Sequence, residues 1–278
     1  MSDPVELDAS EVPAPGSGEL TFIGTATVLI RYGGFTLLTD PNFLHRGDHA
    51  TLGYGLHSRR LTEPALTIGE LPPLDLIVLS HHHGDHFDEV AAAELDKAIP
   101  IVTTAHASAK LRRQGFVRPI TLDTWQSQLF VRGEATLRVT AVPGRHAPGA
   151  LAALLPPVMG SVVEFGHSGQ VAFRLYVSGD TLVHDRLSEI PQRYPDLDLG
   201  LLHLGGTRVL GVLVTMDAEQ GIEALRIIRP RTAVPIHYED YTVFKEPLAV
   251  FQDAVARASL PTSIRYVARG ETVHLGGG

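Results

Sequence analysis

The chain has 278 residues, of which 44% are hydrophobic and 19% charged, with a formal net charge of -8 at pH 7. This composition is that of a globular protein, and the acidic balance argues against a nucleic-acid partner held by phosphate contacts. Because cysteine is absent, disulfides and thiol catalysis are excluded, and any metal must be bound by His, Asp or Glu.

Residues 1–18 contain prolines and glycines and no apolar core. They predict a flexible leader in front of a single domain at residues 19–278. The leader has the pattern of neither a signal peptide nor a transit peptide, so we expect a cytoplasmic protein. No apolar stretch of the sequence is long enough to span a bilayer, and we do not expect a membrane partner.

Three short strands are predicted at residues 20–23, 27–32 and 35–39, and Gly33-Gly34 has the sequence of a two-residue hairpin turn of the primed type. The third strand ends at Asp40, whose carboxylate is predicted to orient a metal-bound histidine, with a simple turn-capping role as the alternative. Residues 42–73 then form a long connection with little periodicity. We expect it to line a substrate pocket, although a solvated surface loop is nearly as compatible with the sequence.

A histidine-rich segment follows the apolar run 74–79, which predicts a buried strand: Ser80-His81-His82-His83-Gly84-Asp85-His86. Residues i and i+2 of an extended segment point the same way, so His81 and His83 can converge while His82 faces elsewhere. Asp85 and His86, at the turn into a helix, can reach a second point nearby. This order predicts a split site for two metal ions, and the alternative is a run of ordinary solvated histidines.

The rest of the chain alternates between strand and helix patterns. Strands are predicted at 99–103, 129–132, 136–142, 162–165, 171–177, 199–204, 232–236, 264–267 and 272–275, and helices at 88–97, 107–114, 217–228 and 247–258. The apolar segment 147–160 is predicted to be a lid or an apolar wall of the site, or else a buried crossover loop. The pattern predicts an α+β fold of two similar β-then-α halves with mostly antiparallel strands, packed sheet against sheet with helices outside.

Three further ligand-type residues, His146, Asp180 and His237, each come at or just after the end of a predicted strand. A shared edge of two packed sheets would bring them to the histidine-rich segment. Each oxygen of Asp180 can serve one ion, so this residue is predicted to bridge two metals, and a water between the metals is the expected nucleophile. Asp85 is also predicted to orient the nucleophile. Weaker predictions for substrate or oxyanion contacts are His203, Tyr238 and the pair Arg59-Arg60.

The Ser-His-x-His-x-Asp-His motif at residues 80–86, together with His146, Gly179-Asp180-Thr181 and His237, resembles the metallo-β-lactamase superfamily. The resemblance implies a four-layer αβ/βα sandwich. It also implies a first metal bound by three histidines, a second bound by one aspartate and two histidines, and a bridging aspartate: His81, His83 and His146; Asp85, His86 and His237; and Asp180.

Within the superfamily, the chain looks closest to the group of ascorbate-6-phosphate lactonase and N-acylphosphatidylethanolamine-type phospholipase D. The features that carry this likeness include Ile23-Gly24-Thr25-Ala26-Thr27, Thr39-Asp40-Pro41, His86-Phe87-Asp88, Gly205-Gly206 and Pro235-Ile236-His237-Tyr238. The chain departs from the group at Thr25, where histidine is frequent, and at Ala147 and Tyr238, where the phospholipase pattern has tryptophan.

The function that these predictions favour is a binuclear metal-dependent hydrolase, whose metal-bridging hydroxide acts on a small ester, lactone or phosphodiester. Two divalent metal ions are expected, with zinc favoured by the imidazoles and manganese or iron also compatible. The alternatives are a phospholipase D-like lipid hydrolase and a non-catalytic metal-binding protein on the same fold. Redox di-iron chemistry is disfavoured because the resemblance would then place a glutamate at His83. The expected partner is a small-molecule substrate, and a homo-oligomer is compatible with the sequence.

Overall fold

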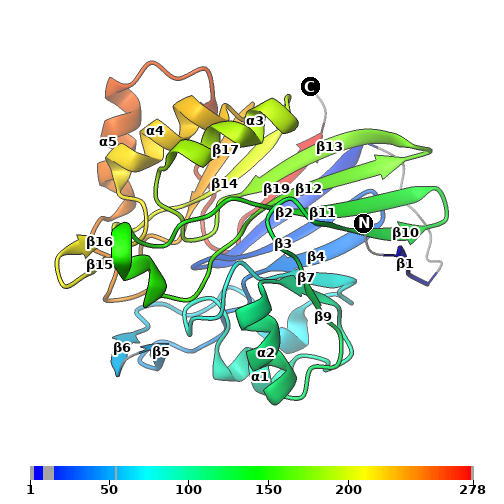
Figure 1. Cartoon of the computed structure of the whole chain (residues 1–278), viewed down its shortest axis with the longest axis horizontal. Coiled ribbons are helices and arrows are strands. Elements are labelled where there is room, and N and C mark those ends of the chain that lie inside the picture. The colour runs from blue at the N-terminus through cyan, green and yellow to red at the C-terminus, as the bar shows by residue number, and fades with distance from the viewer. Residues whose placement is uncertain (1–2, 9–15, 54, 277–278) are drawn as a thin grey trace.

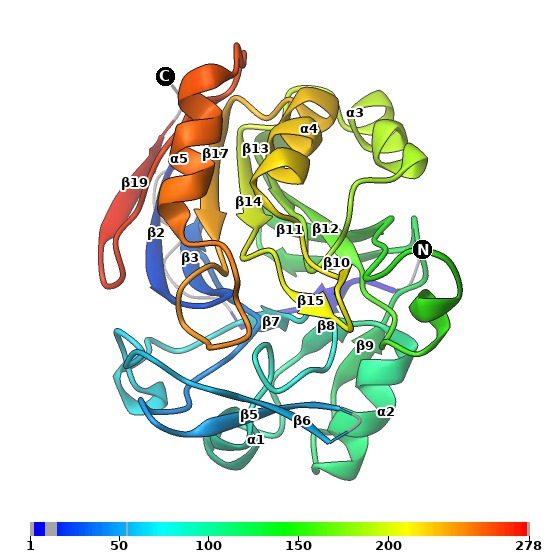
Figure 2. The same cartoon turned by 90° about the vertical axis from the view of Figure 1, so that its left-hand side faces the viewer.

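The computed structural model describes residues 3–8, 16–53 and 55–276, and in these ranges two mixed sheets pack face to face (Figures 1 and 2). The larger sheet has eight described strands, in the order β1 (Val5–Glu6), β10 (Ser127–Arg132), β11 (Ala135–Val142), β12 (Gly160–His167), β13 (Gln170–Val177), β14 (Leu199–His203), β17 (Thr232–Ile236) and β18 (Ser263–Ile264). The smaller has seven, in the order β19 (Thr272–Gly276), β2 (Ser17–Gly24), β3 (Thr27–Tyr32), β4 (Phe35–Thr39), β7 (Leu76–Val78), β8 (Ile101–Thr103) and β9 (Pro119–Thr121).

Helices cover the outer face of each sheet. Figure 1 shows α3, α4 and α5 on the larger sheet and α1 and α2 on the smaller one. The α-helices are α1 (Glu89–Glu94), α2 (Ala105–Arg113), α3 (Glu189–Arg193), α4 (Ala218–Ile228) and α5 (Leu248–Arg257). The short 3₁₀ helices are η1 (Ile68–Glu70), η2 (Gly149–Ala153) and η3 (Asp185–Ser188), and two small hairpins are β5 (His49–Gly53) with β6 (Leu56–Arg59) and β15 (Arg208–Val209) with β16 (Val212–Leu213).

The central strands have continuous apolar sequences because both of their faces are buried. In β3, five of the six residues are buried, because one face meets the other sheet and the opposite face meets helices. Ile30 of β3 and Leu137 of β11 belong to the core between the sheets, whereas Leu29 belongs to the layer under α1 and α2. The predicted four-layer αβ/βα sandwich is therefore confirmed.

The prediction of mostly antiparallel sheets is wrong. Each large sheet combines antiparallel hairpins with a run of parallel pairs: β13-β14, β14-β17 and β17-β18 in one, and β4-β7, β7-β8 and β8-β9 in the other. Hairpin turns can join only antiparallel neighbours, but segments that include α1, α2 or α4 are long enough to return the chain in the parallel sense.

Two strands pair outside the segment to which the sequence analysis assigned them. The C-terminal strand β19 pairs with β2, so it completes the sheet of the first half. Within the predicted leader, β1 pairs with β10 and residues Ser17 and Gly18 already belong to β2, whereas residues 1–2 and 9–15 lie outside the described ranges.

The connection 42–73 has more structure than its sequence predicted. It holds the β5-β6 hairpin and the η1 turn, and the hairpin forms no pairs with the two large sheets. The predicted hairpin turn at Gly33-Gly34 is confirmed. Gly33 and Gly34 both have positive φ, at 57° and 84°, as a primed hairpin turn requires. Asp217 caps α4 by accepting a hydrogen bond from the backbone N–H of Gln220, at 3.1 Å.

The parallel arrangement fixes where function can lie. In β4 and β7, Thr39 stands opposite Val78, and in β14 and β17, His203 stands opposite Ile236. The carboxyl ends of these strands therefore lie at one edge of the sandwich. In parallel sheets this is the edge where ligands bind.

Candidate metal centre

The residues just beyond these strand ends form a buried cluster. The described residues that could hold a metal fall into overlapping groups whose ligand atoms lie within 4.8 Å of one another: His81, His83 and His146; Asp85, His86 and His237; His81, His86 and Asp180; and Asp40, His86 and His203. The structure thus brings together all seven residues for which metal binding was predicted.

The first group consists of three imidazoles. Nδ1 of His83 lies 3.0 Å from Nε2 of His81 and 3.4 Å from Nε2 of His146. As expected for alternate residues of an extended segment, the intervening His82 points away, with its Nε2 3.2 Å from Oε1 of Gln114.

The second group adds a carboxylate. Nε2 of His237 lies 3.5 Å from Oδ2 of Asp85. Asp180 stands between the groups, because its Oδ2 is 3.3 Å from Nε2 of His86 and its Oδ1 is 3.7 Å from Nε2 of His237. The hydroxyl of Thr215 donates a hydrogen bond to Oδ2 of Asp180 at 3.0 Å and so fixes the carboxylate.

Hydrogen bonds on the far side of the rings set their tautomers. Nδ1 of His146 lies 2.8 Å from the carbonyl oxygen of Val214, and Nδ1 of His237 lies 3.0 Å from that of Leu204. A carbonyl oxygen only accepts, so each Nδ1 must carry a proton, and in the neutral ring Nε2 then presents a lone pair to the centre.

Asp40 holds two histidine rings of the cluster in place, one directly and one through Ser80, as its position before Pro41 suggested. Its Oδ1 accepts the backbone N–H of Ser80 at 2.7 Å, and its Oδ2 accepts the hydroxyl of Ser80 at 3.0 Å. The same Oδ2 lies 3.2 Å from Nδ1 of His86. Ser80 Oγ in turn lies 3.0 Å from Nδ1 of His81, so Asp40 orients both rings.

The electrostatics divide the histidines into two kinds. Burial, reinforced by the neighbouring His146, lowers the pKa of His83 to about 3, and burial also lowers the pKa of His81 and His146. Burial opposes charge on His86 as well, but Asp180, Asp40 and Asp85 outweigh it and raise the pKa of His86 well above its ordinary value. The first group therefore consists of neutral imidazoles, the form that binds metal.

Unpaired buried atoms test whether the residues of the cluster fit a cation. Among the described residues, four atoms that face the centre have no hydrogen-bond partner: Asp85 Oδ1, His86 Nε2, Asp180 Oδ1 and His237 Nε2. Buried acceptors without a donor are costly, and a cation removes that cost. Protons on His86 and His237 would meet part of this demand, and metal ions would meet it fully. The donor set therefore fits divalent metal.

The structure gives other contacts to three residues for which substrate contacts were weakly predicted: His203, Tyr238 and Arg60. His203 is fully buried, with Nε2 3.3 Å from Oδ2 of Asp40 and Nδ1 3.1 Å from Oγ of Ser178, so both ring nitrogens are used inside the protein. The Tyr238 ring packs near Phe22, with 6.5 Å between the ring centroids.

The arginine pair does not reach the centre either. Arg60 is 1% exposed, and its guanidinium contacts Asn42 and the hydroxyl of Tyr241. Arg59 is exposed at the end of β6. Neither arginine lines the cavity described next.

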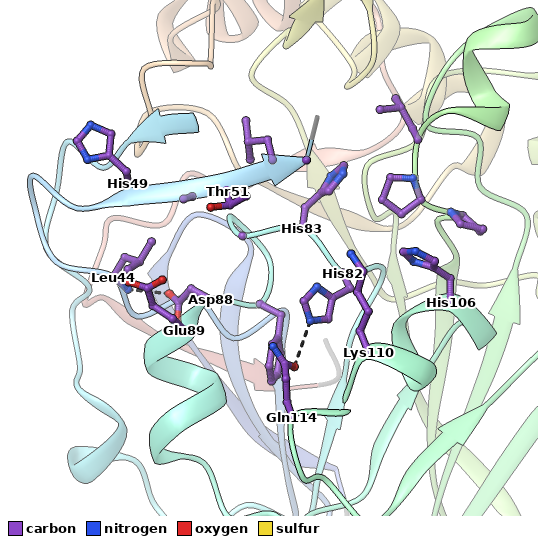
Figure 3. Close-up of a pocket in the computed structure, with 18 of the residues that line it drawn as sticks. Leu44, His49, Thr51, His82, His83, Asp88, Glu89, His106, Lys110 and Gln114 are labelled. Carbon is purple, nitrogen blue, oxygen red and sulfur yellow. Dashed lines mark hydrogen bonds between the residues drawn. The ribbon is translucent and has the colours of Figure 1, made fainter. Parts of the chain in front are cut away.

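A cavity of about 580 Å³ opens beside the centre and meets it at His83 (Figure 3). Parts of both long loops, 42–73 and 147–160, line it: Leu44, His49–Gly53 and Leu154–Pro157. Its other wall comes from α2, through residues that the sequence analysis did not identify: His106, Lys110 and Gln114. The spacing of His106 and Lys110, four residues apart on a helix, was the available signal.

The comparisons with known proteins agree with this architecture. The model of the β-lactamase superfamily domain matches residues 36–238, and the chain belongs to this family. A UPF0173 metal-dependent hydrolase of Deinococcus radiodurans is 30% identical over 243 residues, covering 82% of this chain and 96% of the relative. One from Thermus thermophilus is 29% identical over 232 residues, covering 82% and 87%.

Solved structures show the same fold. Isothiocyanate hydrolase from Delia radicum gut bacteria superposes with a TM-score of 0.77 at 24% identity, covering 92% of this chain and 98% of that one. The names of the relatives agree with the predicted class, a metal-dependent hydrolase of the metallo-β-lactamase superfamily. No helix in the described ranges has the length and apolar character needed to cross a membrane.

Proposed function

We propose that this protein is a binuclear metal-dependent hydrolase that acts on a small ester, lactone or phosphodiester. The observation that carries the proposal is a buried centre of imidazole and carboxylate lone pairs with unpaired atoms, open to a cavity at His83. The proposed ligands are three histidines for the first ion, an aspartate and two histidines for the second, and a bridging aspartate: His81, His83 and His146; Asp85, His86 and His237; and Asp180.

Two divalent ions at this centre would polarise the oxygen of the scissile group and lower the pKa of a nearby water. Zinc suits the imidazole-rich set, and manganese or iron is compatible with the mixed ligands. The protein's own contribution is preorganisation, since Asp40 and the carbonyl groups of Val214 and Leu204 fix the rings before substrate arrives.

Asp85 has a second role in this proposal. Burial opposes its charge, but His86 and His237 lower the pKa of the Asp85 carboxyl to about 2, so it is ionised at neutral pH. One oxygen faces His237, and the unpaired Oδ1 is available to accept a hydrogen bond from the attacking water.

The size of the cavity favours a small substrate over a lipid, since about 580 Å³ lies within the range of small-molecule sites. This observation supports the lactonase side of the narrower resemblance more than its phospholipase side. A cytoplasmic location, the absence of a nucleic-acid partner and a possible homo-oligomer stay predictions.

Elemental analysis of the purified protein, combined with hydrolysis of a chromogenic phosphodiester and a panel of lactones, tests the proposal. The wild type is compared with Asp180→Asn and with Asp185→Asn, a control on the exposed start of η3. We expect about two metals per chain and a loss of activity in Asp180→Asn alone. Absence of bound metal, or activity indifferent to Asp180→Asn, would rule out the mechanism.

A further inference from the structure

One wall of the cavity is formed by the side of α2 that carries His106 and Lys110. These residues are four positions apart, so their side chains leave the helix on the same face. Figure 3 shows them beside His82 and Gln114, on the opposite side of His83 from Leu44 and Glu89.

Within the described part of the chain, no side chain is paired with the ammonium group of Lys110. Among the described residues, no carboxylate lies within ion-pair distance of it and no acceptor is hydrogen-bonded to it, and it is the one lysine or arginine that lines the cavity. Partial burial lowers the pKa of Lys110 from its ordinary value.

The carboxylates of the cavity do not offset this charge. Asp88 is 4% exposed, and its oxygens are used by the backbone N–H groups of Ala91, Phe43 and Leu44. Glu89 lies across the cavity from Lys110 in Figure 3. The two ends of the cavity thus differ in charge, with the cation on the side of α2.

Another part of the lining is apolar, and one residue of the lining belongs to the proposed metal centre. Leu154, Leu155, Pro156 and Pro157 line the cavity from the loop that follows η2, and His83 lies where the cavity meets the centre. A molecule with a reactive bond at His83 would therefore have an apolar wall for its body and an unpaired cation within the same cavity.

We propose that Lys110, assisted by His106, is an anion-recognition subsite that selects substrates bearing a carboxylate separated from the scissile bond by a short apolar chain. The proposal rests on the proposed hydrolase function and specifies its substrate class. Lys110 supplies the charge, and His106 can supply a hydrogen bond to the same anionic group.

A matched pair of chromogenic esters tests the selection: mono-4-nitrophenyl adipate, which carries a terminal carboxylate, and 4-nitrophenyl hexanoate, which has a methyl group in its place. In Lys110→Gln we expect kcat/KM for the adipate ester to fall about tenfold, through a rise in KM, and kcat/KM for the hexanoate ester to change less than about twofold. The control is Arg112→Gln, which removes the same charge from a residue on another side of α2 that does not line the cavity.

Equal losses on both esters, or the same loss in Arg112→Gln, would overturn the subsite. Binding of the adipate dianion to the metal-loaded protein, measured by calorimetry, separates this proposal from the proposed function. If the wild type hydrolyses neither ester, a Kd for adipate about tenfold weaker in Lys110→Gln than in wild type still supports the subsite. An unchanged Kd would refute it.

Discussion

Replacement of Asp40 by Asn tests whether metal binding depends on the carboxylate that orients the ligand histidines. The carboxylate is 1% exposed and has four contacts: the backbone N–H and hydroxyl of Ser80 at 2.7 and 3.0 Å, Nδ1 of His86 at 3.2 Å, and Nε2 of His203 at 3.3 Å. Burial opposes the charge, but His86 and His203 keep the pKa of Asp40 below its ordinary value, so the group is an ionised acceptor.

Asparagine has nearly the same shape but replaces one accepting oxygen by an amide group that only donates. Either Ser80 or the pair of histidines must then lose its acceptor. A buried donor left without an acceptor costs roughly 1–3 kcal/mol. Loss of such a supporting carboxylate typically weakens metal affinity 10–100-fold, or about 1.4–2.7 kcal/mol, which is the same range.

The assay is competition for metal with a chromogenic chelator at neutral pH, and we expect Asp40→Asn to weaken the metal Kd by roughly 10–100-fold. The matched control is Asp75→Asn, because Asp75 is also largely buried and accepts from the backbone N–H of Thr36 at 2.8 Å and from Arg132 at 2.5 Å, away from the centre. It should lose stability without losing metal. A metal Kd within about twofold of wild type in Asp40→Asn, or an equal loss in Asp75→Asn, would refute the reasoning.

The remaining predictions concern stability. The folded pKa of His83, about 3, lies below its unfolded value, so the unfolded chain binds more protons and stability falls as pH drops from about 6.5 toward 3. In chelator-treated protein, His83→Gln should therefore shrink the difference in urea-unfolding free energy between pH 7 and pH 5 by about 2 kcal/mol, and an unchanged difference would contradict it. Gly84→Ala places a Cβ 2.6 Å from the backbone nitrogen of Thr51 and should cost about 1–3 kcal/mol by denaturant unfolding; wild-type stability would mean that β5 moves freely. Asp217→Ala removes the cap of α4 and should cost about 1 kcal/mol in the same assay, whereas Asp217→Asn should retain most of it.

Local sequence was sufficient wherever the structural cause is local. Positive φ at Gly33 and Gly34, the cap at Asp217 and the convergence of His81 with His83 all depend on residues within a few positions of one another. Strand ends were also visible in the sequence, because apolar runs stop where ligand-type residues begin.

Long-range pairing was not visible. The position of β19 beside β2 joins residues about 250 positions apart, and neither strand carries a local signal for that neighbour. The parallel pairs were missed for the same reason, since an isolated buried strand has the same apolar pattern in either sense.

The direction of side chains just past a strand was likewise decided by tertiary structure. His237 has a positive φ of 64°, which turns its ring into the centre while Tyr238 packs elsewhere, and His203 is directed onto Asp40 by the packing of β14 beside β17. The sequence by itself determined which residue types gather at the edge of the sandwich, because that follows from strand ends. Tertiary structure decided which of these residues face the candidate metal centre, which hold the ligand rings in place and which form a cavity. These roles depend on contacts between segments remote in the chain, for which local sequence carries no physical signal.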